Sequence, residues 1–224
     1  MDILKQAAMS YKEVSEYDYT FWLGSAKKKI TISILSVHEE NFNHVAGLDH
    51  LKDVPLVTST KLVEKKAIFR DIIKDRITYD SIKSSQYISV VHSQDGNNTF
   101  TIKERIEEIG NIKNYLDNSC KGKFYKWNTS NCIFRQCTIR ADYVLEIPID
   151  STKSMYFFLK QNTEQKRRKD KMSPMKLYII SAFSDSVRLS EGQQRPFPIL
   201  KILRKHIKSK EEIELYINPI LSQD

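Results

Sequence analysis

The spacing of hydrophobic positions changes about halfway along the chain. In the first half, apolar residues recur every three or four positions, which is typical of helices that bury one face. The segments with this spacing are 3–11, 39–55, 62–75, 78–84 and 101–118. In the second half, short runs of β-branched and aromatic residues alternate with turn-prone residues, which is typical of an antiparallel meander. These runs are 124–127, 132–137, 141–149, 154–159, 176–183 and 197–203.

Two further elements complete the prediction. Apolar and polar residues alternate over 29–35, and Gly24-Ser25 provides a turn, so strands over 17–23 and 28–37 are expected to pair as a hairpin. Ser209 and Glu212 have the spacing of a capping box, which predicts a short terminal helix. Because a group of helices precedes a run of strands, the predicted fold class is α+β, with a helical N-terminal part packed on an antiparallel sheet.

The 224 residues are expected to form a single domain, 1–224. It divides into a hairpin plus helices (1–118), an antiparallel sheet (119–207) and a short helical tail (208–224). A hydrophobic content of 40%, with only 6 Gly and 6 Pro, excludes collagen-like and wholly disordered classes.

Location and redox context follow from what the sequence lacks. No apolar run approaches the roughly 18–20 residues that a membrane-spanning helix needs. The N-terminus has no signal-peptide pattern. Cys120, Cys132 and Cys137 form no CxxC pair, so buried thiols are expected rather than a disulfide framework. We expect a cytoplasmic protein without membrane contact, metal or cofactor.

The formal net charge of +8 is concentrated in two places. One basic cluster lies between two predicted strands and contains Lys166, Arg167, Arg168, Lys169 and Lys171. The other basic stretch contains Lys201, Arg204, Lys205, His206, Lys208 and Lys210. Such runs are often only solvated surface. Because both flank one set of strands, nucleic-acid contact is the favoured interpretation.

Candidate chemistry centres on one histidine. Phosphate-binding glycine loops, HExxH, GxSxG and EF-hand patterns are all absent. Segment 41–51 places His44 beside Leu48 and Leu51 on one helical face. At the edge of a core, such a histidine suits general acid–base work near neutral pH. The alternative is a structural histidine bonded to a backbone carbonyl, which is the commoner role for a lone histidine on an amphipathic helix.

Six short motifs then occur in a family-like order along the chain. They are Phe42-Asn43-His44-Val45-Ala46-Gly47-Leu48, Thr101-Ile102-Lys103-Glu104-Arg105-Ile106, Ile139-Arg140-Ala141-Asp142-Tyr143-Val144-Leu145, Tyr156-Phe157-Phe158-Leu159, Ile180-Ser181-Ala182-Phe183 and Gly192-Gln193. On these residues the sequence resembles the fourth group of phage-associated barnase/EndoU/colicin E5–D/RelE-like (BECR) nuclease domains. The resemblance runs from about residue 11 to about residue 207, and its F-x-H-x-x-G-L element is the most specific part.

The resemblance implies a BECR-like nuclease fold, with helices on a curved antiparallel sheet and a site for metal-independent RNA cleavage. A base would take the proton of a ribose 2′-OH, cationic donors would stabilise the phosphorane, and an acid would protonate the departing 5′-oxygen. The products would be a 2′,3′-cyclic phosphate and a 5′-OH end. A toxin-like effector of phage or mobile-element origin is the implied role, with tRNA, mRNA or rRNA as substrate and a neutralising antitoxin or immunity protein as a further partner.

Carried over to this chain, the resemblance makes His44, Arg105, Ser181 and Lys201 the catalytic residues, with His44 as the acid/base group. Arg105 and Lys201 would neutralise phosphate charge, and Ser181, with Gln193 as a substrate-binding residue, would position the phosphate. Each has a structural alternative: a helix-surface ion pair for Arg105, a solvent-facing strand position for Ser181, a plain loop residue for Gln193 and a solvated lysine for Lys201. Lys166, Arg167, Arg168 and Lys169 are the expected substrate-binding cations.

Two other function classes remain open on the sequence alone. A non-catalytic nucleic-acid-binding module would keep the fold and the charge but cleave nothing. A protein–protein effector would dock a partner through the aromatic residues Tyr17, Tyr19, Phe21 and Trp22.

Overall fold

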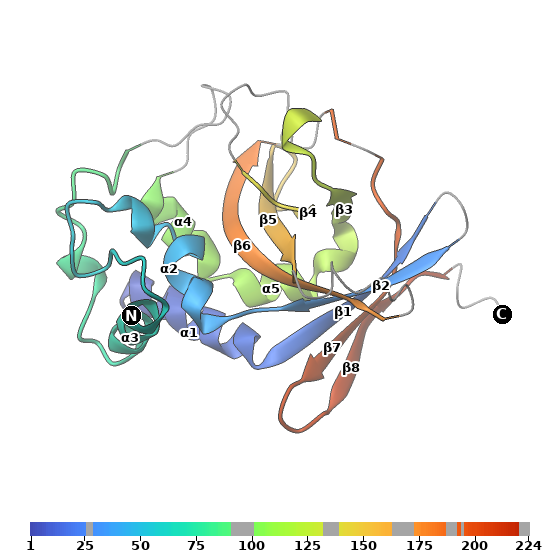
Figure 1. Ribbon diagram of the computed structural model, residues 1–224, viewed down its shortest axis with the longest axis horizontal. Coiled ribbons are helices and arrows are strands. Elements are labelled where there is room, and N and C mark those ends of the chain that lie inside the picture. The colour runs from blue at the N-terminus through green and yellow to red at the C-terminus, as the bar shows by residue number, and fades with distance from the viewer. Residues whose placement is uncertain are drawn as a thin grey trace.

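Figure 1 shows the computed structural model, a layer of helices beside a strongly curled sheet. The structure describes residues 1–25, 29–90, 101–131, 139–162, 173–186, 192–193 and 195–219. The helices are α1 (Ile3–Ser15), α2 (Phe42–Val45), α3 (Leu62–Ile73), α4 (Ile102–Ile109) and α5 (Ile112–Asp117). The strands are β1 (Tyr17–Gly24), β2 (Ile30–Ser36), β3 (Lys123–Lys126), β4 (Tyr143–Pro148), β5 (Lys153–Gln161), β6 (Met175–Ser186), β7 (Ile199–His206) and β8 (Glu212–Ile217).

The eight strands form one sheet in the order β3-β4-β5-β6-β2-β1-β7-β8. Neighbouring strands are antiparallel except for β2 and β6, which run parallel with Leu35 opposite Leu177. The sheet curls so far that Phe124 of β3 forms a bridge with Phe197, just before β7. It is therefore a half-barrel (Figure 1), and the expected all-antiparallel sheet is wrong at the β2–β6 pair.

Two hydrophobic clusters occupy opposite faces of the β3–β6 part of the sheet. The larger cluster holds the helices against alternate strand residues such as Phe157 and Ala182. The smaller cluster contains the intervening residues: Tyr125, Trp127, Val144, Tyr156, Phe158 and Phe183. Alternation of side chains along a strand produces this division. The α+β fold class predicted from the two periodicities is confirmed.

Local signals predicted most elements correctly, but two expected long helices are interrupted. The hairpin of β1 and β2 is confirmed, with Tyr19 opposite Leu35. The expected helix over 39–55 is a short helix α2 between two 3-10 turns, Glu39–Asn41 and Leu48–His50. The segment 101–118 is divided into α4 and α5 at Gly110, and 78–84 contains only a 3-10 turn, Tyr79–Ser81.

The predicted terminal helix is wrong, because residues 212–217 form strand β8 against β7. Ser209 does not cap a helix: its hydroxyl bonds the Nδ1 atom of His206, 2.8 Å away, in the turn between the two strands. Lys210, with φ of +62°, completes that turn. The pairing partner, and not the local capping signal, decides the structure here. The expected strand over 132–137 lies outside the described residues.

Among the described residues, no helix combines the length and the apolar character needed to cross a bilayer.

Candidate active site

Helix α2 is anchored between the helical layer and strand β6. The ring of Phe42 is fully buried and packs edge-on against Tyr11, 5.4 Å between centroids. Just before α2, the side-chain amide of Asn41 donates to the carbonyl of Ile179, 3.2 Å away. Ile179 directly precedes the irregularity in β6 opposite the Phe158–Leu159 step. These anchors hold the next turn of the chain, with His44, beside the middle of β6.

Gly47 follows this helical segment, and its lack of a side chain leaves room for Ile102 and Arg105. Its φ of +78° lies in the left-handed region, where a residue with a Cβ is strained. A Cβ here would also lie 2.9 Å from Cδ1 of Ile102 and 3.1 Å from Cδ of Arg105. The glycine of the F-x-H-x-x-G-L motif therefore both turns the chain and lets Arg105 approach it.

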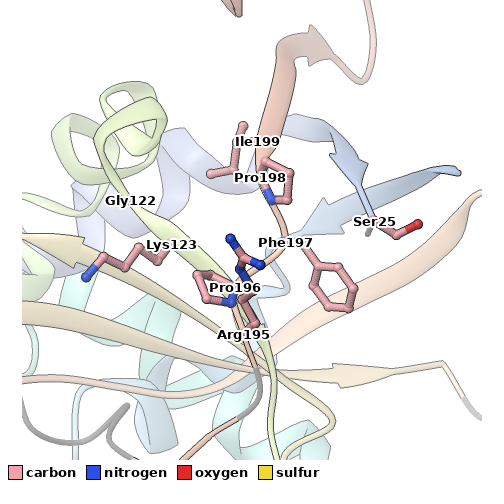
Figure 2. A pocket seen from close by; sticks show the side chains of 8 residues that line it. All are labelled: Ser25, Gly122, Lys123, Arg195, Pro196, Phe197, Pro198 and Ile199. Atoms are coloured by element: carbon pink, nitrogen blue, oxygen red, sulfur yellow. The ribbon is translucent and has the colours of Figure 1, made fainter. Parts of the chain in front are cut away.

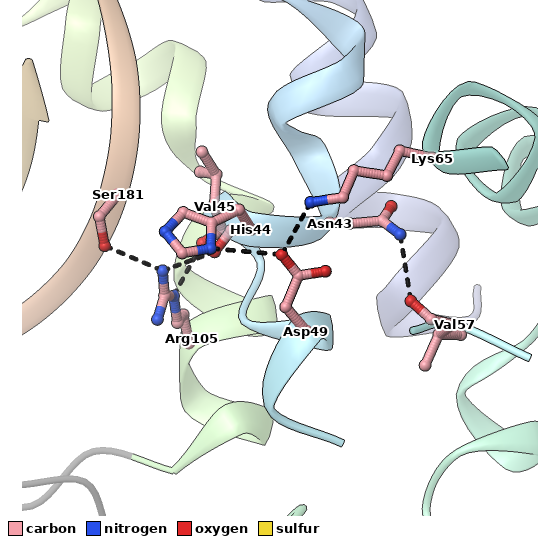
Figure 3. Close-up of polar contacts among 8 residues, drawn as sticks. All are labelled: Asn43, His44, Val45, Asp49, Val57, Lys65, Arg105 and Ser181. Carbon is pink, nitrogen blue, oxygen red and sulfur yellow. Dashed lines mark hydrogen bonds and ion pairs between the residues drawn. The ribbon is translucent and has the colours of Figure 1, made fainter. Parts of the chain in front are cut away.

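Arg105 points inward from α4 and joins the helical layer to the sheet (Figure 3). It is only 4% exposed. Its Nε donates to the carbonyl of Val45 at 2.8 Å, and one Nη donates to the carbonyl of His44 at 2.8 Å and to Oγ of Ser181 at 3.1 Å. A helix-surface ion pair with Glu104 or Glu108 is thus excluded. Three segments that are distant in sequence meet at one guanidinium.

The guanidinium of Arg105 donates hydrogen bonds to neutral acceptors and forms no ion pair with a described residue. Its Cζ lies 5.9 Å from the ring centroid of Phe183. Burial lowers the pKa of Arg105 to about 10, with the nearby Asp49 charge opposing the shift. The guanidinium therefore stays charged at neutral pH, and its charge is not neutralised by direct contact with a carboxylate.

His44 lies at the surface beside this buried cation. Its side chain is 50% exposed, and its Nδ1 lies 3.3 Å from Oδ2 of Asp49. A carboxylate can only accept, so Nδ1 carries the hydrogen and Nε2 of the neutral ring is left as an acceptor. Figure 3 shows the ring beside the Arg105 guanidinium, with Asp49 on one side and Ser181 on the other. A solvent-accessible nitrogen base therefore lies next to a buried positive charge.

Asp49 is a residue that the sequence analysis did not select. Besides contacting His44, its Oδ2 accepts from Nζ of Lys65 at 3.0 Å. Burial of the carboxyl raises its pKa, but bonds and charges from His44 and Lys65 outweigh burial and hold the pKa of Asp49 below its ordinary value. Its position directly after Gly47-Leu48 was the available signal, because the turn at Gly47 brings the following residues back towards the histidine.

Lys201 does not join this group. It lies on β7, separated from β6 by β2 and β1 in the sheet order. Its Nζ forms an ion pair with Glu214 of β8 at 2.6 Å and lies 6.0 Å from the Trp22 ring centroid. Two neighbours in the basic stretch are also paired, Arg204 with Asp117 and Lys205 with Glu212. Much of the expected cationic surface at 201–205 is therefore neutralised locally.

Gln193 lies apart from His44 in a different contact. Its side-chain amide accepts from the backbone nitrogen of Asn128 at 2.9 Å and donates to the carbonyl of the same residue at 3.1 Å. Both ends of the amide are thus used to hold the turn after β3. The predicted substrate-binding cations Lys166, Arg167, Arg168 and Lys169 lie outside the described residues.

The expected aromatic docking surface is largely part of the core. Tyr19 and Phe21 are fully buried, and Tyr17 and Trp22 are half-buried. Within the ranges that the structure describes, no group of three or more His, Cys, Asp or Glu side chains is arranged to hold a metal ion. The site is thus composed of His44, Asp49, Arg105 and Ser181.

Comparison with known proteins gives one match. No curated protein and no solved structure matches the chain. The sequence model of the family described as phage-Barnase-EndoU-ColicinE5/D-RelE like nuclease4 matches residues 3–220, a range that includes all of the site residues. This match confirms the resemblance carried by the six short motifs. Because it covers nearly the whole chain, the protein belongs to this phage-associated nuclease family.

Proposed function

We propose that the protein is a metal-independent endoribonuclease that uses His44 as its base. The observation that carries the proposal is that the buried, charged guanidinium of Arg105 donates to the backbone carbonyl of His44, whose imidazole is half-exposed. Cleavage through the ribose 2′-OH needs both: a base for the hydroxyl proton and positive charge near the phosphate oxygens. Phosphodiesters that lack a 2′-OH would not react, which makes RNA the substrate.

In the proposed reaction, Nε2 of His44 removes the 2′-OH proton while the 2′-oxygen attacks the adjacent phosphorus. The new P–O bond closes a 2′,3′-cyclic phosphate, and the P–O5′ bond breaks. The departing 5′-oxygen takes a proton from water, and the imidazolium returns its proton to solvent. Negative charge increases on the phosphate oxygens in the transition state, and the field of Arg105 stabilises it from beneath the histidine.

The other residues hold these groups in position. Asp49 orients the imidazole by accepting from Nδ1 and stabilises the imidazolium once it forms. Ser181 and the carbonyls of His44 and Val45 hold the guanidinium in place. Preorganised groups of this kind lower a barrier because they do not have to reorganise during the reaction.

Incubation of the purified protein with RNA in EDTA tests the proposal. We expect cleavage by the wild type and a loss of about 100- to 10,000-fold in rate for His44→Ala, the usual range for removing a general base. His50→Ala is the matched control, because His50 lies in the following 3-10 turn and has no role in the proposed reaction. Intact RNA in EDTA, or equal cleavage by His44→Ala, would eliminate the proposed mechanism.

The family membership also supports a role as a toxin-like effector that acts on cellular RNA in the cytoplasm. Controlled expression in a bacterial host is the test of that role. Growth arrest with the wild type and normal growth with His44→Ala are expected; arrest by both variants would place the toxicity outside this site. A neutralising protein partner would be sought by its ability to restore growth.

A non-catalytic RNA-binding module is the second candidate, because the nitrogens of Arg105 that donate in the structure are bonded to protein acceptors. It predicts RNA binding that weakens steeply with salt, without strand scission. The cleavage assay in EDTA separates the two candidates.

A further inference from the structure

A cavity over the neighbouring strands of the sheet has no role in the proposed reaction. It has a volume of about 540 Å³ and is lined by Trp127, Asn128, Thr129, Ser130, Arg140, Ala141 and Lys160. Its walls come from the turn after β3, the chain just before β4 and the end of β5. We refer to it as the Arg140–Lys160 cavity.

The cavity contains two positive charges that no described carboxylate neutralises. Nζ of Lys160 donates to the backbone carbonyl of Arg140 at 2.9 Å, so the ammonium is held against that residue. Arg140 is exposed and forms no ion pair with a described residue. The Asp142 carboxylate instead accepts from the backbone nitrogen of Gln161 at 2.9 Å. A guanidinium and an ammonium that line one cavity are a combination that suits a phosphate.

The cavity lies on the same side of the sheet as the candidate active site. Phe158 of β5 is directly opposite Ser181 of β6. Lys160 follows Phe158 by two residues, so it is on the same face and about 7 Å farther along the strand. A row of aromatic rings also connects the cavity to the site. The ring centroids of Trp127 and Phe158 are 5.1 Å apart, and those of Phe158 and Phe183 are 5.3 Å apart. Phe183 in turn lies under Arg105.

The turn that forms one wall is rigidly held. Nε1 of Trp127 donates to the carbonyl of Ile139 at 3.0 Å, and Oγ1 of Thr129 donates to the same carbonyl at 2.6 Å. The amide of Gln193 holds the backbone of Asn128 from the other side. The predicted site residue Gln193 therefore maintains the shape of this cavity instead of contacting His44.

We propose that the Arg140–Lys160 cavity binds a phosphate of the RNA strand next to the one that is cleaved. The proposal rests on the proposed RNA cleavage for its placement relative to the scissile bond. Arg140 and Lys160 bind the flanking phosphate, and the protein thereby fixes the register of the strand across β5 and β6. Their contribution is made equally in the ground state and the transition state, so it lowers KM and leaves kcat unchanged.

The test compares two double variants that remove the same charge from different cavities. Arg140→Gln/Lys160→Gln empties the proposed subsite of charge. Lys123→Gln/Arg195→Gln does the same in a separate cavity of about 460 Å³, whose lining includes both residues (Figure 2). Neither Lys123 nor Arg195 has an ion-pair partner among the described residues, so the two changes are matched.

Binding of a fluorescent single-stranded RNA oligonucleotide is measured by anisotropy at several salt concentrations, with all variants also carrying His44→Ala to prevent cleavage. For Arg140→Gln/Lys160→Gln we expect about 10-fold weaker binding and a salt slope smaller by about 0.7, the value for one lost single-strand phosphate contact. The Lys123→Gln/Arg195→Gln control should bind like its parent. Equal weakening in both variants would show a general charge effect and would overturn the subsite, as would no change in either.

Cleavage kinetics distinguish this proposal from the proposed function. In the protein that retains His44, Arg140→Gln/Lys160→Gln should raise KM for a long RNA about 10-fold and leave kcat unchanged. A dinucleotide, which has no flanking phosphate, should be cleaved by this variant as it is by the wild type. Cleavage with an unaltered KM would overturn the subsite and leave the nuclease intact. RNA binding that depends on Arg140 and Lys160 but is not followed by cleavage would overturn the proposed nuclease activity and leave the proposed subsite. Inorganic phosphate should compete with the RNA for this subsite. Arg140→Lys keeps a positive charge at this position, so it should bind the RNA more tightly than Arg140→Gln but less tightly than the wild type.

Discussion

Cationic side chains meet different acceptors at two places in the same sheet. On β7, Lys201, Arg204 and Lys205 each contact a carboxylate, and their charges are neutralised within the fold. Beside β6, Arg105 is more deeply buried, yet its hydrogen bonds go to two backbone carbonyls and a serine hydroxyl. Its charge is thus held in place without being cancelled.

In our proposal, the difference separates cations that are paired with a carboxylate from a cation whose field acts on the substrate. A paired lysine has little remaining attraction for phosphate, because its carboxylate partner repels the incoming anion. A guanidinium fixed by neutral dipoles has no carboxylate in direct contact with it, and the low dielectric of its surroundings strengthens its field. Counting basic residues along the sequence cannot make this distinction, since it depends on the acceptors that each cation meets.

Removing the two arginines is expected to give the largest contrast in stability. Arg105→Gln leaves the buried carbonyl of Val45 without its donor and removes one of the donors to the carbonyl of His44, so we expect a loss of about 2–4 kcal/mol in the free energy of unfolding. Arg204→Gln breaks a partly exposed ion pair with Asp117 and should cost about 1 kcal/mol. Urea denaturation measures both. Equal losses would indicate that the two cations are held alike.

Gly47→Ala sharpens the comparison by altering the contact of Arg105 without altering its charge. The left-handed backbone costs an L-residue about 1–2 kcal/mol, and the added Cβ crowds Ile102 and Arg105. We expect that loss in urea denaturation together with reduced RNA cleavage. Gly24→Ala is a control with an ordinary φ. Full activity in a destabilised Gly47→Ala protein would show that the close approach of Arg105 does not matter for catalysis.

Asp49→Asn tests the carboxylate that serves the site. Because the pKa of Asp49 is lowered in the folded protein, its contribution to stability is fully present above the ordinary aspartate pKa of about 3.9 and is lost as pH falls through the lower folded value. The stability difference from wild type should therefore be largest at neutral pH and shrink in acid. A difference that grows in acid would contradict the assignment.

In Asp49→Asn we expect kcat of RNA cleavage to fall more than KM rises, because in the proposed reaction Asp49 orients the base and does not bind substrate. Asp53→Asn is a matched control, since this carboxylate bonds Ser85 and the backbone of Gln86 instead of the histidine. A rise in KM at constant kcat would indicate that Asp49 affects binding of the RNA.

Lys201→Gln is expected to have the smallest effect. It removes one exposed pair with Glu214, worth about 0–1 kcal/mol, and should change RNA cleavage by less than about twofold. Side-by-side cleavage rates for Lys201→Gln and His44→Ala provide the check. A large loss of activity in Lys201→Gln would remove the distinction between neutralised and available cations.

The sequence predicted the elements whose signals are local. The alternation in 29–35 and the helical spacing in 62–75 correspond to β2 and α3. The parallel pairing of β2 with β6 could not be predicted, since either orientation would bury Leu35. The strand β8 was mistaken for a helix because the Ser209–Glu212 spacing is a capping signal only when no neighbouring strand competes for the backbone.

Three members of the candidate site were selected from the sequence, but one member was missed and the arrangement was not predicted. His44, Arg105 and Ser181 were all selected, and they meet. Asp49 was overlooked because an uninterrupted helix would have placed it away from His44, and the turn at Gly47 returns it. Lys201 was included because its pairing with Glu214 depends on a strand that the sequence did not reveal.

The most direct test of the central claim is the chemistry of the product ends. A single RNA oligonucleotide is incubated with the protein in EDTA, and its fragments are identified by mass spectrometry, together with a copy that carries 2′-deoxyribose at the cleaved position. The account predicts 2′,3′-cyclic phosphate and 5′-OH ends from the first and no cleavage of the second at that position. Cleavage of the deoxy-substituted copy at the same bond, or 5′-phosphate ends, would contradict a reaction in which His44 activates the 2′-hydroxyl.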